Sequence, residues 1–223
     1  MSLRVVDVVV SNKRTGEDYE AKSYPNWDHN NDGLYEFYKT PVYYVYIDGT
    51  SDAGARERRT WKAPRFMPYW NDPKAPDPHY KSHGFTNSGL TYVPRKAVKL
   101  YNRHYEVHNT FSPFGGAIQI QGSFLIHAGP ENLAASGWGA AGCVEVMGDF
   151  EGFKADILAL AGWKGSPPFL TAPDHDGGLA ALVDAQKLFV TVEKATAPNL
   201  LKAMTRQMAW VEVDGGGGYF TDP

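Results

Sequence analysis

The order of apolar and polar residues along the chain predicts β-strands separated by turns rich in glycine, proline, asparagine and aspartate. Turn signals lie at 11–16, at Asp48-Gly49 and at 112–116. The predicted strands span residues 5–10, 19–22, 40–47, 98–107, 117–127 and 187–192. Strands therefore dominate the prediction.

Helix signals are fewer and lie in the second half of the chain. Asp149 is a candidate N-cap for a helix that runs through Leu160, and Gly162 lies near its end. A second short helix is predicted over 179–186, and Pro198 favours a third over 199–208. The prediction is a mainly β fold, a β-sandwich or open barrel with a few short helices.

The chain has the length of one domain, which we expect to span residues 1–213. Six prolines between residues 62 and 94 predict an irregular, aromatic-rich loop there. The glycines at 215–218 predict a flexible tail over 214–223, because they lack the strand-to-helix context of a phosphate-binding loop.

Composition narrows the classes of protein that fit. The hydrophobic fraction of 43% is enough for a sizeable core, and the net charge of −3 gives no reason to expect a nucleic-acid partner. No stretch reaches the roughly 18 apolar residues of a membrane span. The segment at 4–10, which contains Arg4 and Asp7, is too short and too charged for a signal-peptide core, so no signal peptide is visible.

Cys143 is the only cysteine of the chain, and it lies where a turn of small residues enters an alternating strand. His127 ends an earlier strand, 16 positions before it. A single cysteine with a histidine elsewhere is a candidate nucleophile and base, and a nearby imidazole can lower the thiol pKa toward working pH. The alternative is that Cys143 is a small buried hydrophobe and His127 a structural strand-end residue.

The remaining histidines do not predict a metal site. His104 and His108 are four positions apart on a predicted strand, about 13 Å, which is too far to share one ion. His79 and His83 lie in the proline-rich loop without an evident third ligand. We therefore expect no metal and no cofactor.

The segments Ile126-His127-Ala128-Gly129 and Gly142-Cys143-Val144-Glu145-Val146 together resemble the active-site signature of the L,D-transpeptidase (YkuD-like) catalytic domain. The resemblance covers about residues 95–195 in pattern. Two departures mark a divergent member. Ala140-Ala141 stand where the family has Ser/Thr-His, and Glu145 replaces an arginine that is common in the family.

The resemblance implies an enzyme, a cysteine acyltransferase or peptidase that acts on peptidoglycan stem peptides through a thioester. Cys143 would attack the carbonyl and His127 would act as base. The Ala128 carbonyl would orient the imidazole. The backbone N–H groups of Gly142 and Cys143 would bind the oxyanion. An amine acceptor would give transpeptidation, and water would give carboxypeptidase or endopeptidase activity.

The resemblance also implies a substrate pocket, formed by Gly129, Ser136, Trp138 and Glu145. Glu145 points to the same side of an alternating strand as Cys143, so its carboxylate could attract a substrate amine. It could equally be a solvated residue at the pocket rim. Trp138, like Trp61 and Trp70, either lines a groove or anchors the core, and the core role is favoured by the area that each side chain buries.

The expected partners are a peptidoglycan stem peptide and, as a covalent inhibitor, a carbapenem β-lactam. By resemblance the protein would work in the periplasm or outside the cell. One alternative is an antibacterial effector that uses the same chemistry on a rival's peptidoglycan. Another is a catalytically inactive domain that binds cell-wall glycan or a protein through its aromatic loop.

Overall fold

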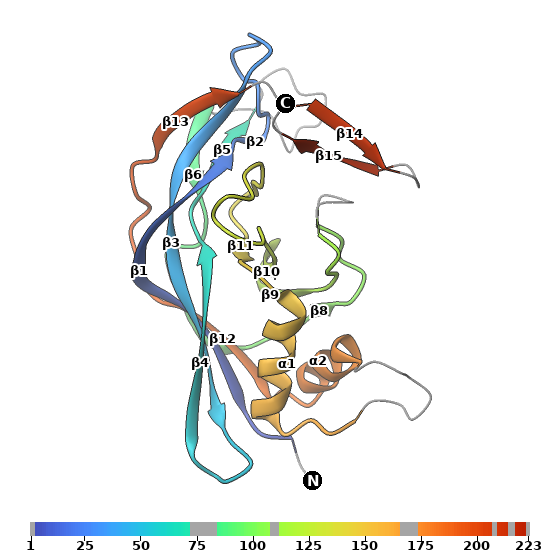
Figure 1. The fold of residues 1–223 in the computed structure, drawn as a ribbon. Helices are drawn as coiled ribbons and strands as arrows, with labels where there is room; N and C mark the ends of the chain where they lie inside the picture. Colours follow the sequence, from blue (N-terminus) through green and yellow to red (C-terminus); the bar gives the residue numbers. More distant parts are fainter. Residues whose placement is uncertain are drawn as a thin grey trace.

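The computed structural model describes residues 3–71, 84–107, 112–165, 174–206, 209–213 and 217–221 (Figure 1). Within these ranges the chain is mainly β and has two helices, which confirms the predicted mainly β class with a few short helices. The strands form one large sheet, one smaller sheet that carries the candidate site, and two minor sheets.

The large sheet is built around two long strands that run along one side of the molecule (Figure 1). Its strand order is β13-β3-β1-β12-β7, with β4 also paired to β3. Strands β1 and β12 are parallel, and the other pairs are antiparallel. The members are β1 (Val6–Lys22), β3 (Tyr35–Thr50), β4 (Arg56–Pro64), β7 (Val93–Ala97), β12 (Leu188–Val192) and β13 (Leu201–Arg206).

The smaller sheet has the order β11-β10-β9-β8. Its strands are β8 (Tyr101–Asn102), β9 (Ala117–Gln121), β10 (Phe124–Ala128) and β11 (Val144–Val146). Met147, just after β11, donates its backbone N–H to the Lys62 carbonyl of β4 at 2.9 Å, which ties this sheet to the large one. One of the minor sheets contains β2 (Tyr24–Pro25), β5 (Met67–Asn71) and β6 (Gly84–Ser88), and the other β14 (Ala209–Val213) and β15 (Gly217–Thr221).

One hydrophobic core joins the two larger sheets and both helices. Val8 of β1 and Val190 of β12 are neighbours in the parallel ladder, and both are fully buried. Ile126 of β10 belongs to the same cluster. Each such side chain contributes roughly 1.5–3 kcal/mol on burial, so this alternation is the main stabilising pattern of the sheets.

Helix α1 (Phe150–Ala161) agrees with the prediction at both ends. Asp149 is its N-cap residue, and Gly162 ends it in the left-handed conformation with φ 70°. Helix α2 (His175–Asp184) begins before the predicted residue 179, because the Asp174 side chain accepts a hydrogen bond from the Gly177 N–H and caps it there.

The turn predicted at residues 11–16 is wrong, because β1 continues through it. The pairing of β1 with β3 shifts register twice, between Val10 and Arg14 and again before Asp18. The Ser11 carbonyl accepts a hydrogen bond at 3.0 Å from the fully buried guanidinium of Arg65. The turn-forming residues are therefore accommodated as bulges in one strand.

Two further predicted strands have different bounds in the smaller sheet. Only Tyr101–Asn102 is a strand within the predicted 98–107. The predicted strand 117–127 is instead the hairpin of β9 and β10, whose turn contains Gly122 with φ 57°. A glycine that accepts positive φ lets the chain reverse within two residues.

The predicted loop 62–94 and the predicted C-terminal elements also differ from the structure. Strands β5 and β6 pair within the proline-rich region, whereas residues 72–83 lie outside the described part. The predicted helix 199–208 is wrong: β13 pairs with the edge of β3 there. The predicted tail is partly a strand, because β15 pairs with β14.

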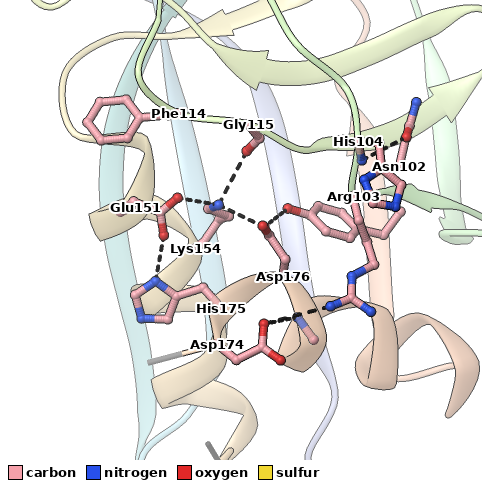
Figure 2. A network of polar contacts seen from close by, with 12 residues as sticks. Asn102, Arg103, His104, Phe114, Gly115, Glu151, Lys154, Asp174, His175 and Asp176 are labelled. Carbon is pink, nitrogen blue, oxygen red and sulfur yellow. Dashed lines mark hydrogen bonds and ion pairs between the residues drawn. The ribbon is translucent and has the colours of Figure 1, made fainter. Parts of the chain in front are cut away.

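A polar network joins α1, α2 and β8 (Figure 2). Lys154 of α1 is 1% exposed, and its ammonium contacts Glu151, the Asp176 carboxylate at 2.8 Å and the Gly115 carbonyl at 3.3 Å. The Tyr101 hydroxyl donates to the same Asp176 oxygen. These contacts compensate the buried charge and hold the two helices against the smaller sheet.

Replacing Asp176 tests this network. Asp176→Ala removes a carboxylate from Lys154 and the acceptor of Tyr101, so we expect a loss of about 1–3 kcal/mol in the free energy of unfolding at pH 7. Burial alone would raise the pKa of Asp176, but hydrogen bonds from Lys154 and Tyr101 outweigh it and leave the pKa lowered. The stability that Asp176 contributes is therefore fully present at pH values above the ordinary carboxyl pKa. It is lost as the pH falls through the lowered pKa of Asp176.

Denaturant unfolding at pH 7 and in acid measures both effects. Asp184→Ala is the control, because that exposed carboxylate lies on α2 outside the network. Equal stability of Asp176→Ala and the parent at pH 7 would show that the network contributes nothing.

Candidate functional site

Strands β10 and β11 place the two candidate catalytic residues on one face of the smaller sheet, with the Cys143 sulfur 3.9 Å from the Ser123 carbonyl oxygen. They pair in parallel, with Ile126 opposite Val144 and His127 opposite Glu145. Continued by one residue, this register places Cys143 beside Leu125. Because alternate residues of a strand share a face, Leu125 and His127 lie on one face of β10, and Cys143 lies diagonally from His127 on that face.

His127 is held in one orientation. Its side chain is 1% exposed, and Nδ1 donates to the Ala128 carbonyl at 2.7 Å. The Tyr105 ring lies over the imidazole with 5.1 Å between ring centroids. A donor at Nδ1 leaves Nε2 of the neutral ring as the proton acceptor. Ala128 thus makes the contact that the sequence resemblance assigns to it.

The turn before Cys143 is shaped by glycine. Gly142 has φ 96°, and a Cβ there would lie 2.6 Å from the Gly89 nitrogen. The Ser88 hydroxyl at the end of β6 donates to the Ala141 carbonyl at 2.8 Å. The minor sheet containing β6 therefore packs directly against the turn whose N–H groups are the predicted oxyanion donors.

The Cys143 thiol is less acidic than the sequence interpretation expects. Burial raises its pKa to about 11, the backbone N–H of Leu125 acts in the opposite direction, and the Glu145 carboxylate raises it further. The expected lowering toward working pH is therefore corrected. At neutral pH the thiol is protonated, so a base has to remove the proton when the sulfur reacts.

Glu145 is not a solvated residue of the pocket rim, because it is fully buried. Burial lowers the pKa of Lys22 to about 8, and Glu145 opposes that shift. Burial raises the pKa of Tyr19, and Glu145 adds to it. Burial also raises the pKa of Tyr105, and Cys143 and Glu145 raise it further. These five residues form what we call the buried polar cluster: Tyr19, Lys22, Tyr105, Cys143 and Glu145.

The segment between β10 and β11 is fixed to β1. The Tyr19 hydroxyl donates to the Ala135 carbonyl at 2.7 Å and accepts from the Trp138 N–H at 3.1 Å. Gly139 passes so close to Lys22 that a Cβ would lie 2.4 Å from its carbonyl oxygen. The segment that leads into Cys143 is therefore positioned by the long strand β1.

A pocket of about 440 Å³ lies beside this segment. Of the four predicted pocket residues, Gly129 and Trp138 line it, together with Phe114 and Asp149. The Ser136 hydroxyl instead accepts a hydrogen bond from Arg206 at 2.8 Å, and Glu145 lies in the buried polar cluster. The structure thus places two of the predicted residues around one cavity and two elsewhere.

The other predictions about aromatic and histidine side chains have mixed outcomes. Trp61 donates to Asp156 at 3.0 Å and packs against Phe153, which makes it an anchor for α1. His104 follows β8 in a turn, so the strand predicted there is wrong. The three remaining histidines of the two candidate pairs, His79, His83 and His108, lie outside the described residues.

One group of potential ligands was missed by the sequence analysis. One carboxylate oxygen from each of Asp28, Asp32 and Glu36 lies within 4.8 Å of the others. The pattern Asp28-x-Asn30-x-Asp32-Gly33 is the signal that would have found it.

Comparisons of the chain with protein-family models, with curated proteins and with solved structures found no match. Neither helix in the described part of the chain is long and apolar enough to cross a membrane.

The raised thiol pKa can be measured by alkylation. We expect the rate of Cys143 modification by iodoacetamide to be low at pH 7 and to rise toward a midpoint near pH 11, because only the thiolate reacts. Glu145→Gln should move the midpoint to lower pH, since it removes a negative charge beside the sulfur. Glu131→Gln, an exposed position, should not. A parent midpoint at or below the free-thiol value of about 8.5 would contradict this account.

Proposed function

We propose that this protein is a cysteine acyltransferase or peptidase that acts on peptidoglycan stem peptides, as a divergent relative of the L,D-transpeptidases. The observation that carries the proposal is the shared face of β10 and β11, with Cys143 diagonal to a His127 ring that the Ala128 carbonyl orients. A nucleophile, a base and a group that orients the base are the minimum for this chemistry.

The reaction would begin from the neutral pair. His127 Nε2 takes the thiol proton as the Cys143 sulfur attacks the substrate carbonyl, and the N–H groups of Gly142 and Cys143 stabilise the oxyanion. The imidazolium then gives that proton to the leaving amine, and a thioester remains on Cys143. An amine acceptor or water releases the acyl group by the same steps in reverse order. A thiol pKa of about 11 favours this route over a thiolate formed before substrate binds.

The pocket suggests where the substrate lies. Gly129, two residues beyond His127, lines the cavity together with Trp138, whereas His127 and Cys143 are not among its lining residues. Because Glu145 is buried, we expect its charge to act on the acidity of the thiol, and the sequence-based idea that it selects substrate charge directly no longer holds. A peptidoglycan substrate implies work in the periplasm or outside the cell.

A second candidate function is favoured by the same thiol. A half-buried cysteine with a raised pKa is also what an inactive domain would contain, and such a domain would bind cell-wall glycan or a protein partner. The two candidates differ in whether Cys143 accepts an acyl group.

Incubation with a carbapenem, followed by intact-mass measurement, separates them. The enzyme should gain one adduct, because the strained lactam carbonyl stands in for the stem-peptide carbonyl. Cys143→Ala should gain none. His127→Ala should acylate about 10²–10⁴-fold more slowly, the usual contribution of a general base.

His104→Ala is the matched control, since His104 is exposed in the turn after β8. An adduct that persists in Cys143→Ala, or a folded parent that gains no adduct, would contradict the enzymatic proposal. The second outcome would leave the binding domain as the better account.

A further inference from the structure

The loop between β2 and β3, together with the first residues of β3, brings three carboxylates close to one another. Asp28 is half-buried, Asp32 is exposed and Glu36 is fully buried, and one oxygen of each lies within 4.8 Å of the others. Three negative charges at this separation repel one another unless a cation lies among them.

The sequence of the loop follows a known cation-binding order. Asp28, Asn30 and Asp32 occupy the first, third and fifth positions of a calcium loop, and Gly33 occupies the sixth, where a sharp turn is required. Gly33 has φ 82°, as that turn needs. The twelfth position is Lys39 in place of the usual glutamate, and the chain continues into strand β3. The carboxylate nearest that role is Glu36, at the ninth position.

Glu36 supplies an independent observation that points to a ligand. Its side chain is 0% exposed, and its Oε1 is a buried oxygen that has no hydrogen-bond partner among the described residues. The exposed Lys202 ammonium forms an ion pair with that oxygen at 3.8 Å, beyond hydrogen-bond distance, and the other Glu36 oxygen accepts the His29 backbone N–H at 3.3 Å. A buried carboxylate oxygen without a donor is costly, and a bound cation would remove that cost.

The main chain of the loop already holds the carboxylates in place. Asp32 and Gly33 donate their N–H groups to the two oxygens of Asp28 at 3.1 and 3.0 Å. The Leu34 N–H donates to Asp32 at 2.9 Å. Binding a cation would therefore require little ordering of the loop.

We propose that Asp28, Asp32 and Glu36 bind one Ca²⁺ ion. The ligand atoms are all oxygens, which suits a hard cation, and calcium accepts the irregular arrangement that a loop provides. The imidazole of His29 lies at the edge of this group: its Nε2 is 3.1 Å from the Tyr38 hydroxyl and 3.6 Å from a Glu36 oxygen, and its ring stacks on Trp70 with 4.2 Å between centroids.

The position of the loop defines what the ion would do. Through His29 and Trp70 the loop contacts β5, which pairs with β6, and β6 supports the Gly142 turn. Calcium would therefore stabilise the fold on the side where the candidate catalytic cysteine lies, without contacting the reacting atoms.

Titration of the EDTA-treated full chain with CaCl₂ tests the proposal by calorimetry and by thermal unfolding. At a hundredfold excess over the dissociation constant, Ca²⁺ should raise Tm by about 5–10 °C. Mg²⁺ should act more weakly, because it demands a more regular shell. These readouts do not depend on catalysis, so they stand or fall separately from the proposed function.

Asp28→Asn and Asp32→Asn should each abolish the Ca²⁺-dependent shift, and Asp184→Asn on α2 should keep it. Lys202→Gln should tighten binding, because it removes a competing positive charge from Glu36. The proposal is overturned if millimolar Ca²⁺ gives neither heat nor a Tm shift in the parent, if the shift persists in both Asp variants, or if Mg²⁺ stabilises as strongly as Ca²⁺.

Discussion

The parallel pairing of β10 with β11 is the constraint on which the candidate site depends. Only three residues of β11 take part, yet this register sets Cys143 diagonally from His127 and buries Glu145 beside them. Glycine makes the pairing possible. A Cβ at Gly129 would lie 2.7 Å from the Glu145 carbonyl carbon, and Gly142 turns the chain into β11 at a positive φ. A larger residue at position 129 would push β10 and β11 apart, and a larger residue at position 142 would collide with Ser88 and Gly89 and displace the turn that carries Cys143.

Burial sets the chemistry of this arrangement as much as proximity does. Glu145 lies inside the buried polar cluster, where its charge makes the thiol of Cys143 harder to ionise and the ammonium of Lys22 easier to keep. Under the proposed mechanism each cycle begins from a protonated thiol, so proton transfer to His127 accompanies attack. The two positions at which the chain differs from the signature that it resembles thus have different consequences. Ala140-Ala141 place no polar side chain in the turn, and Glu145 raises the pKa of the Cys143 thiol from within the core.

The sequence predicted the features that local chemistry determines. The fold class, helix α1 between Asp149 and Gly162, the central part of β3 and strand β12 all follow from periodicity and capping residues. It failed where tertiary contacts override local signals. The residues predicted to form a turn at 11–16 lie in a bulged part of β1, where Arg65 donates to the Ser11 carbonyl. Residues 201–206 pair with the edge of β3 as β13, although Pro198 favoured a helix there. The burial of Glu145 could not be predicted from the sequence either. The alternation of residues along a strand indicates which face of the sheet a side chain takes, but it does not indicate what packs on that face. The carboxylates of the β2–β3 loop were visible in the spacing of Asp28, Asn30 and Asp32 and were overlooked.

The central claim is that His127 removes the Cys143 proton during attack on the carbonyl. The solvent isotope effect on the rate of acylation tests it most directly, measured with the same acyl donor in water and in deuterium oxide below the thiol pKa. This account predicts slower acylation in deuterium oxide, because a proton is being transferred in the transition state. It also predicts that His127→Ala loses most of the acylation rate and no longer shows the difference between the two solvents. Acylation of the parent that is equally fast or faster in deuterium oxide would contradict the account, because a thiol that ionises before attack gives no slowing in that solvent.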